Sequence, residues 1–81
     1  MKDSDRQAAL EALGRAIRSR RLALGMSQED LAFRVGLDRT YVGGVERGER
    51  NVSFVNLLAI TKGLETPIEE LMRAFSKERH G

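Results

Sequence analysis

The sequence predicts a small all-α protein built from five helices. Apolar residues recur at spacings of three, four and seven, which is the period of a helix with one buried face. No segment alternates apolar and polar residues for long enough to indicate a strand. Glycines separate the periodic segments at the positions where helices commonly end. The helices are expected over residues 7–24, 28–35, 39–47, 54–62 and 67–76.

The first helix, over 7–24, carries an apolar stripe that includes Leu10, Leu13 and Ile17, and Gly25 ends it. The second and third helices each follow a residue that can accept a hydrogen bond from the first turn. Their N-caps, and the glycines that end them, are Ser27 with Gly36 and Asp38 with Gly48.

The last two helices show the same punctuation. Ser53 caps the fourth helix, and Gly63 ends it. Thr66 caps the fifth helix, and Pro67 suits its first helical position. Residues 1–81 then form one domain, in which we expect the ends, residues 1–6 and 77–81, to fray.

Composition argues against most catalytic classes. The chain has 81 residues, a net charge of +2, no cysteine and one histidine, His80, so thiolate zinc sites and histidine-based chemistry are not expected. The acidic pairs at 29–30 and 69–70 are neighbours in helical first turns, where carboxylates favour the helix dipole. We therefore expect no enzyme, cofactor, metal or membrane segment, and a cytoplasmic location.

Residues 26–48 hold the informative pattern. Two short helices are joined by Gly36-Leu37-Asp38, which is the layout of a helix-turn-helix. The first turn of the second helix of such a unit reaches base edges in the major groove of DNA. That turn is Arg39-Thr40-Tyr41, so these residues are the predicted base contacts, although the Tyr41 ring can equally pack beside the core.

Two adjacent glycines, Gly43 and Gly44, interrupt the same helix at a cost of about 1 kcal/mol each. They lie away from its apolar stripe. One interpretation is a bare face that lets the helix approach the DNA bases closely. The other is close packing against a second helix.

Polar and basic groups around this unit can bind phosphates. Helix N-termini present free N–H groups to phosphate, and cations add affinity. The candidate phosphate contacts are Gln28, Arg47, Arg50, Asn51 and Ser53. Arginines at positions 15, 18, 20 and 21 of the first helix belong either to this surface or to an ordinary solvated face.

The pattern resembles the phage-repressor family of Cro/XRE-type helix-turn-helix proteins over residues 10–75. The matching residues are Gly14, Ile17, Arg18, Arg21, Gly25, Ser27, Gln28, Leu31, Ala32, Gly36, Leu37, Asp38, Val45, Glu46, Arg47, Gly48, Ser53, Leu57, Ile60 and Leu64. The resemblance implies a lambda-repressor-like five-helix domain that binds double-stranded operator DNA as a homodimer. It also implies an Arg21–Glu46 salt bridge, with Arg21 partly at a DNA phosphate or serving structure alone.

The run from Ser27 to Ser53 is similar to the controller proteins of restriction–modification systems, which are small helix-turn-helix dimers that regulate transcription. This similarity makes RNA polymerase a candidate partner.

The fifth helix presents Ile68, Met72 and Phe75, which are the predicted homodimer interface. The same apolar residues fit an alternative function, an antitoxin-like module that sequesters a partner protein.

Overall fold

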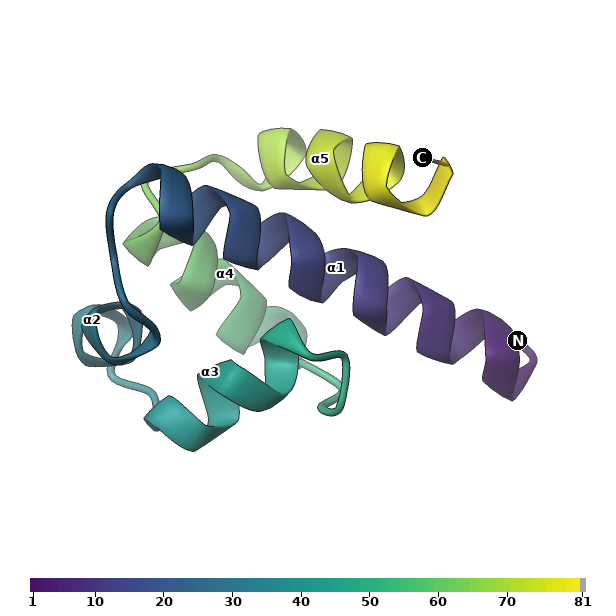
Figure 1. The fold of residues 1–81 in the computed structure, drawn as a ribbon, viewed down its shortest axis with the longest axis horizontal. Helices are drawn as coiled ribbons and strands as arrows, with labels where there is room; N and C mark the ends of the chain where they lie inside the picture. The colour runs from purple at the N-terminus through teal and green to yellow at the C-terminus, as the bar shows by residue number, and fades with distance from the viewer. Residues whose placement is uncertain (81) are drawn as a thin grey trace.

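The computed structural model describes residues 1–80, which form five α-helices and no strand. The all-α prediction is therefore confirmed for this part of the chain. The helices are α1 (Asp3–Ala23), α2 (Gln28–Val35), α3 (Arg39–Glu46), α4 (Phe54–Gly63) and α5 (Ile68–His80) (Figure 1). No helix within these residues has the length and apolar character to cross a bilayer.

The two outer helices are longer than predicted. Helix α1 begins at Asp3 and α5 runs to His80, so helical structure extends into the two end segments, 1–6 and 77–80, where the expected fraying stays a prediction. Acidic residues in the first turn of α1 and basic residues in the last turn of α5 favour both extensions through the helix dipole. The Arg15–Glu78 ion pair, at 2.7 Å, also ties the end of α5 to α1. Gly81 lies outside the described residues.

Helix α1 spans the molecule and α5 packs along it in the opposite direction, so both chain ends lie on the same side in Figure 1. Helix α3 packs against α1 and α2 and lies at the lower edge of this view. Helix α4 packs against α2 and α5. This arrangement supports α3 from behind and leaves its outer side at the molecular surface.

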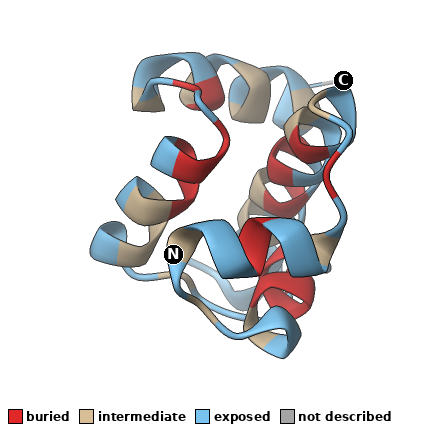
Figure 2. Cartoon of the chain, turned by 90° about the vertical axis from the view of Figure 1, so that its left-hand side faces the viewer, coloured by how far each residue is buried: buried red, intermediate tan, exposed pale blue. Residues whose placement is uncertain are grey.

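Every helix contributes to one core, and the buried residues in Figure 2 face the interior between the helices. Fully burying a side chain of this size contributes about 1.5–3 kcal/mol. Because the core draws on all five helices, the helix-turn-helix cannot shift without disturbing α1, α4 and α5. The largest fully buried side chains are Ile17, Leu31, Val42, Ile60, Leu64 and Leu71.

Candidate nucleic-acid interface

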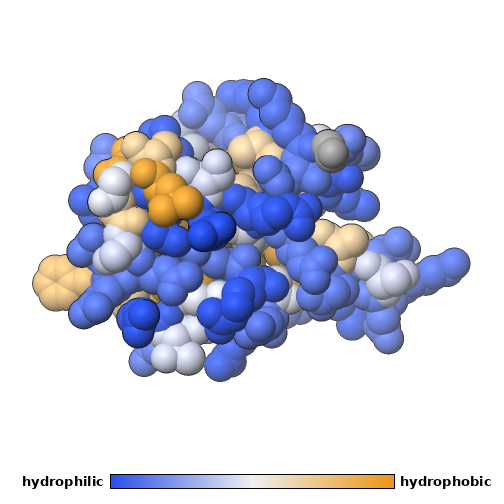
Figure 3. All heavy atoms as spheres, viewed as in Figure 1, coloured by the Kyte–Doolittle hydropathy of each residue, from blue (hydrophilic) through white to orange (hydrophobic). Residues whose placement is uncertain are grey.

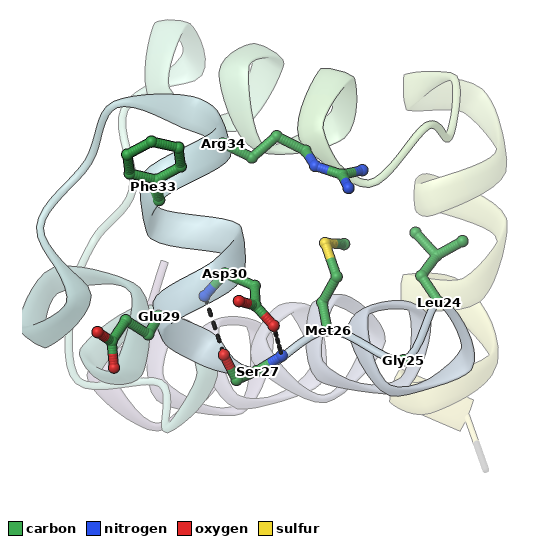
Figure 4. Close-up of a pocket in the computed structure, with 8 residues that line it drawn as sticks. All are labelled: Leu24, Gly25, Met26, Ser27, Glu29, Asp30, Phe33 and Arg34. Atoms are coloured by element: carbon green, nitrogen blue, oxygen red, sulfur yellow. Dashed lines mark hydrogen bonds between the residues drawn. The ribbon is translucent and has the colours of Figure 1, made fainter.

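Local capping fixes where α2 and α3 begin. Ser27 Oγ accepts from the Asp30 backbone N–H at 2.9 Å, and Asp30 Oδ2 accepts from the Ser27 N–H at 2.9 Å (Figure 4). Asp38 Oδ1 accepts from the Thr40 N–H at 2.7 Å, which caps α3. Gly36 adopts the left-handed conformation, with φ of 71°, and turns the chain between the helices. The sequence therefore located both helix starts correctly.

The first turn of α3 is exposed. Arg39 and Thr40 both lie at the surface, and within residues 1–80 neither side chain forms a hydrogen bond or an ion pair. The surface seen over α3 is mostly hydrophilic (Figure 3). Arg39 and Thr40 also line a hollow of about 180 Å³ with Gln28, Gly43 and Arg47. The hollow combines cations with hydrogen-bonding groups, which is the chemistry that recognises phosphates and base edges.

The Tyr41 side chain packs beside the core and is not fully exposed. Its ring is half-buried against the core, and its hydroxyl oxygen accepts a hydrogen bond from Asn56 Nδ2 at 3.1 Å. This bond links α3 to α4. The hydroxyl can still donate its own hydrogen, so Tyr41 combines a structural contact with one remaining donor.

A buried carboxylate joins three helices behind this surface. Glu46 Oε2 accepts from Arg21 Nε at 2.7 Å, and Glu46 Oε1 accepts from Arg21 Nη2 at 2.9 Å. Gln28 Nε2 donates to the same Oε1 at 3.0 Å. Arg21 and Glu46 are each only 6% exposed. The structure thus contains the predicted Arg21–Glu46 salt bridge and adds Gln28 to it.

The expected phosphate contact by Arg21 is wrong. Its guanidinium is buried, and Nη1 donates to the Met26 carbonyl at 2.7 Å while Nε and Nη2 bind Glu46. The hydrogen bond to Glu46 raises the pKa of Arg21 above its ordinary value, so the pair stays charged. Arg21 therefore orients α3 and does not reach a ligand at the surface.

A glycine lets α1 approach the end of α3. A Cβ atom on Gly14 would lie 2.3 Å from the Glu46 carbonyl oxygen and 2.6 Å from that of Val45. Both contacts are to backbone, which cannot move aside as a flexible side chain can. Gly14 therefore sets the close crossing that lets Arg21 reach Glu46.

Gly43 and Gly44 are covered by neighbouring side chains, although Gly43 lines the hollow beside Arg39 and Thr40, so base contacts by the two glycines stay a prediction. A Cβ atom on Gly43 would lie 3.0 Å from Arg47 Nη1 and 3.3 Å from Gln28 Oε1. A Cβ atom on Gly44 would lie 2.7 Å from Arg50 Cγ. The two glycines thus provide room for arginine and glutamine side chains to lie along α3. Neither a bare helix face nor helix–helix packing accounts for them.

The remaining predicted phosphate contacts follow one another around the end of α3 and the start of α4. Arg47, Arg50, Asn51 and Ser53 are all exposed. Ser53 Oγ accepts from the Asn56 N–H at 3.1 Å and caps α4. An exposed ion pair joins Arg47 Nε to Glu49 Oε1 at 3.1 Å, and no feature of the sequence pattern had pointed to it.

Comparison with known proteins agrees with this geometry. Residues 17–71 match the family model described as helix-turn-helix. The chain belongs to the helix-turn-helix family. Control protein C.SmaI from Serratia marcescens is 45% identical over 62 residues, which cover 76% of this chain and 74% of C.SmaI. The family predicted from the sequence is confirmed.

Solved structures give the same result. The restriction–modification controller protein C.AhdI from Aeromonas hydrophila is 55% identical, with a TM-score of 0.75 over 76% of this chain and 94% of C.AhdI. The C.Esp1396I tetramer, solved in complex with its natural 35 base-pair operator, is 40% identical, with a TM-score of 0.85 over 90% of this chain and 96% of that chain. The helix-turn-helix fold is therefore shared with the restriction–modification controllers.

The apolar surface of this helix-turn-helix protein extends beyond the predicted residues. Ile68, Met72 and Phe75 of α5 are half-buried rather than exposed. Stronger exposure occurs on α4, where Phe54 is 66%, Val55 74% and Leu58 41% exposed. The apolar surface of α4 was not among the predicted surfaces, although the first five residues of α4 include four large apolar ones, which is more than one buried face requires.

Proposed function

We propose that this protein is a transcription regulator that binds a specific double-stranded DNA operator as a homodimer and controls a restriction–modification system. The observation that carries the proposal is the exposed first turn of α3. Arg39 and Thr40 reach outward there, while the buried Glu46 carboxylate holds α3 against α1 and α2. A rigid helix with free polar side chains at its amino end suits major-groove recognition.

In this proposal, the first turn of α3 reads the bases. The Arg39 guanidinium donates two hydrogen bonds to the O6 and N7 atoms of a guanine, which is the commonest specific contact of arginine in the major groove. Thr40 contacts a thymine methyl group or donates from its hydroxyl. Tyr41, already bonded to Asn56, has its hydroxyl hydrogen left for a sugar or phosphate oxygen.

Phosphates on either side of the groove fix the position of α3. Arg47 and Arg50 supply charge, and Asn51 and Ser53 lie beside the free N–H groups at the start of α4. Gln28 lies at the first position of α2 and keeps one amide hydrogen beyond the hydrogen bond that it gives to Glu46. These contacts carry affinity rather than sequence preference.

A homodimer gives the operator its symmetry. Two copies of α3 would enter successive major grooves, about 34–36 Å apart. The relative C.Esp1396I forms a tetramer on its operator, which supports self-association in this chain. RNA polymerase is a further partner in this proposal. The protein would meet the operator DNA and the polymerase in the cytoplasm.

Selection of bound fragments from random DNA duplexes tests the proposal. We expect an inverted repeat whose half-sites lie one helical turn apart, and light scattering of the pure protein should give the mass of a dimer. Failure to enrich any sequence would overturn the operator-binding function. A monomer that assembles only with a different chain would favour the antitoxin-like alternative.

A further inference from the structure

An apolar hollow opens between α1, α4 and α5, and none of its lining residues is a proposed DNA contact. It is lined only by apolar side chains, and its volume is about 170 Å³. An apolar cavity of about 150 Å³ is large enough to bind benzene. The hollow is open to solvent, and its volume is close to that of a cavity that holds one phenyl ring. Its lining residues are Ala9, Leu10, Leu13, Leu57, Met72 and Phe75.

The same surface presents a phenyl ring of the matching size. Phe54 lies on α4 and is two-thirds exposed. Leu57, which lines the hollow, follows Phe54 by three residues, and Leu58 follows it by four, so all three share one side of α4. The hollow and the exposed ring are therefore neighbours on one surface.

We propose that Phe54 of each protomer inserts into the hollow of the other protomer. The inference rests on the proposed homodimer and identifies the contact that forms it. A twofold dimer uses the same patch on both subunits, so a patch that carries both a knob and a matching hollow is self-complementary. Helix α4 contributes both Phe54 and one wall of the hollow, Leu57. A single twofold axis beside α4 therefore places each Phe54 at the hollow of the other protomer.

The chemistry of the hollow favours a second copy over a charged ligand. Its lining contains no charged residue and no polar side chain that could fix one. Transfer of two phenylalanine rings from water into apolar hollows provides a hydrophobic driving force, because a fully buried aromatic side chain removes about 150–250 Å² from water and two-thirds of Phe54 is still exposed in the monomer. Large aromatic anchors that fill well-packed, desolvated interface pockets are among the positions that dominate binding energy.

The position of this contact links assembly to DNA binding. Phe54 follows directly after Ser53, and Asn51 is three residues before it. A twofold axis at the start of α4 therefore lies beside the predicted phosphate contacts of both protomers. Loss of the insertion would lower operator affinity although it removes no DNA contact.

The first test compares Phe54→Ala with Phe33→Ala by sedimentation equilibrium. Phe33 is 90% exposed on α2, beside Glu29 and Asp30, and α2 contributes no residue to the hollow, so Phe33→Ala removes an equally large exposed ring (Figure 4). We expect Phe54→Ala to raise the dimer dissociation constant at least about thirtyfold, the size of a hot-spot loss, and Phe33→Ala to leave it unchanged. Equal effects of the two changes would overturn the inference.

A complementation experiment tests the insertion itself. Ala9→Phe fills the hollow but keeps the knob, whereas Phe54→Ala removes the knob but keeps the hollow. Each variant alone should be monomeric at a concentration where the natural chain is dimeric, with unchanged helical circular dichroism. A one-to-one mixture restores one of the two insertions, so its mean mass should rise. A mixture that stays monomeric would contradict the proposed exchange.

The outcomes separate this inference from the proposed function. If Phe54→Ala stays dimeric and still selects an inverted repeat, the insertion is wrong and the operator-binding function stands. If the natural chain dimerises through Phe54 but enriches no DNA sequence, the function is wrong and the interface stands. A natural chain that is monomeric at every accessible concentration would overturn the insertion.

Discussion

The side-chain amide of Gln28 donates a 3.0 Å hydrogen bond to Glu46 Oε1, which joins the first residue of α2 to the last residue of α3. Arg21 of α1 binds both oxygens of the same carboxylate. Three helices therefore meet at one buried charge. The orientation of the proposed recognition helix depends on this charge, so changes inside the protein should alter a surface that they do not touch.

Replacing Glu46 with Gln should destabilise the fold strongly. The change leaves the Arg21 guanidinium buried without a counter-charge, and breaking a buried ion pair in this way costs about 3–5 kcal/mol. Urea denaturation measures the loss. The control is Glu49→Gln, which removes the exposed pair with Arg47 and should cost less than about 1 kcal/mol. Similar losses in both variants would contradict the structural role of Glu46.

Gly44→Ala should separate stability from DNA binding. Alanine favours a helix interior by about 1 kcal/mol, but its Cβ would displace the Arg50 stem, which is flexible enough to move. We expect a fold at least as stable as the natural one and a several-fold weaker affinity for DNA. Thermal unfolding and a fluorescence-anisotropy titration measure the two effects.

Gly14→Ala is the matched comparison for Gly44→Ala. Its Cβ would meet the backbone of Glu46, which cannot yield without separating α1 from α3. We therefore expect a clear loss of stability in this variant. Equal stability in the two alanine variants would show that the crossing of α1 and α3 is looser than the structure has it.

Arg50→Ala should weaken binding to cognate and random DNA alike. An exposed arginine that contacts one phosphate releases about one counterion, so the slope of log affinity against log salt should fall by about 1. Titration at several salt concentrations measures the slope. Arg73→Ala on α5 is the control, and its slope should match that of the natural protein. An unchanged slope for Arg50→Ala would remove Arg50 from the phosphate contacts.

The capping box makes part of the stability pH-dependent. Hydrogen bonds from the backbone and side chain of Ser27 lower the pKa of Asp30 below its ordinary value of 3.8. A lowered pKa means that the stabilisation is complete above about pH 4 and is lost as the pH falls through the folded-state value. The difference in free energy of unfolding between the natural chain and Asp30→Asn should therefore shrink below pH 4. A difference that grows in acid would contradict this assignment.

Local signals account for what the sequence predicted well. The caps at Ser27, Asp38 and Ser53 and the apolar period of each helix act within a few residues, so the five helices and the helix-turn-helix could be read directly. The extra turns of α1 and α5 depend partly on a contact between the two helices, which no local pattern encodes.

The parts of the site that the sequence did not predict depend on side-chain direction. Arg47 and Arg50 fold back over Gly43 and Gly44, and the residue types alone cannot show that. The burial of Arg21 is equally hidden, because arginine is seldom buried unless it is paired.

The most direct test of base recognition by α3 is a parallel selection from random duplexes with the natural protein and with Arg39→Ala. Both should recover an inverted repeat with half-sites about 34–36 Å apart. The variant should accept any base at one symmetric position in each half-site, with an affinity loss of about 1–3 kcal/mol on the natural operator. The same base preference at every position in both selections would contradict the reading of DNA by the first turn of α3.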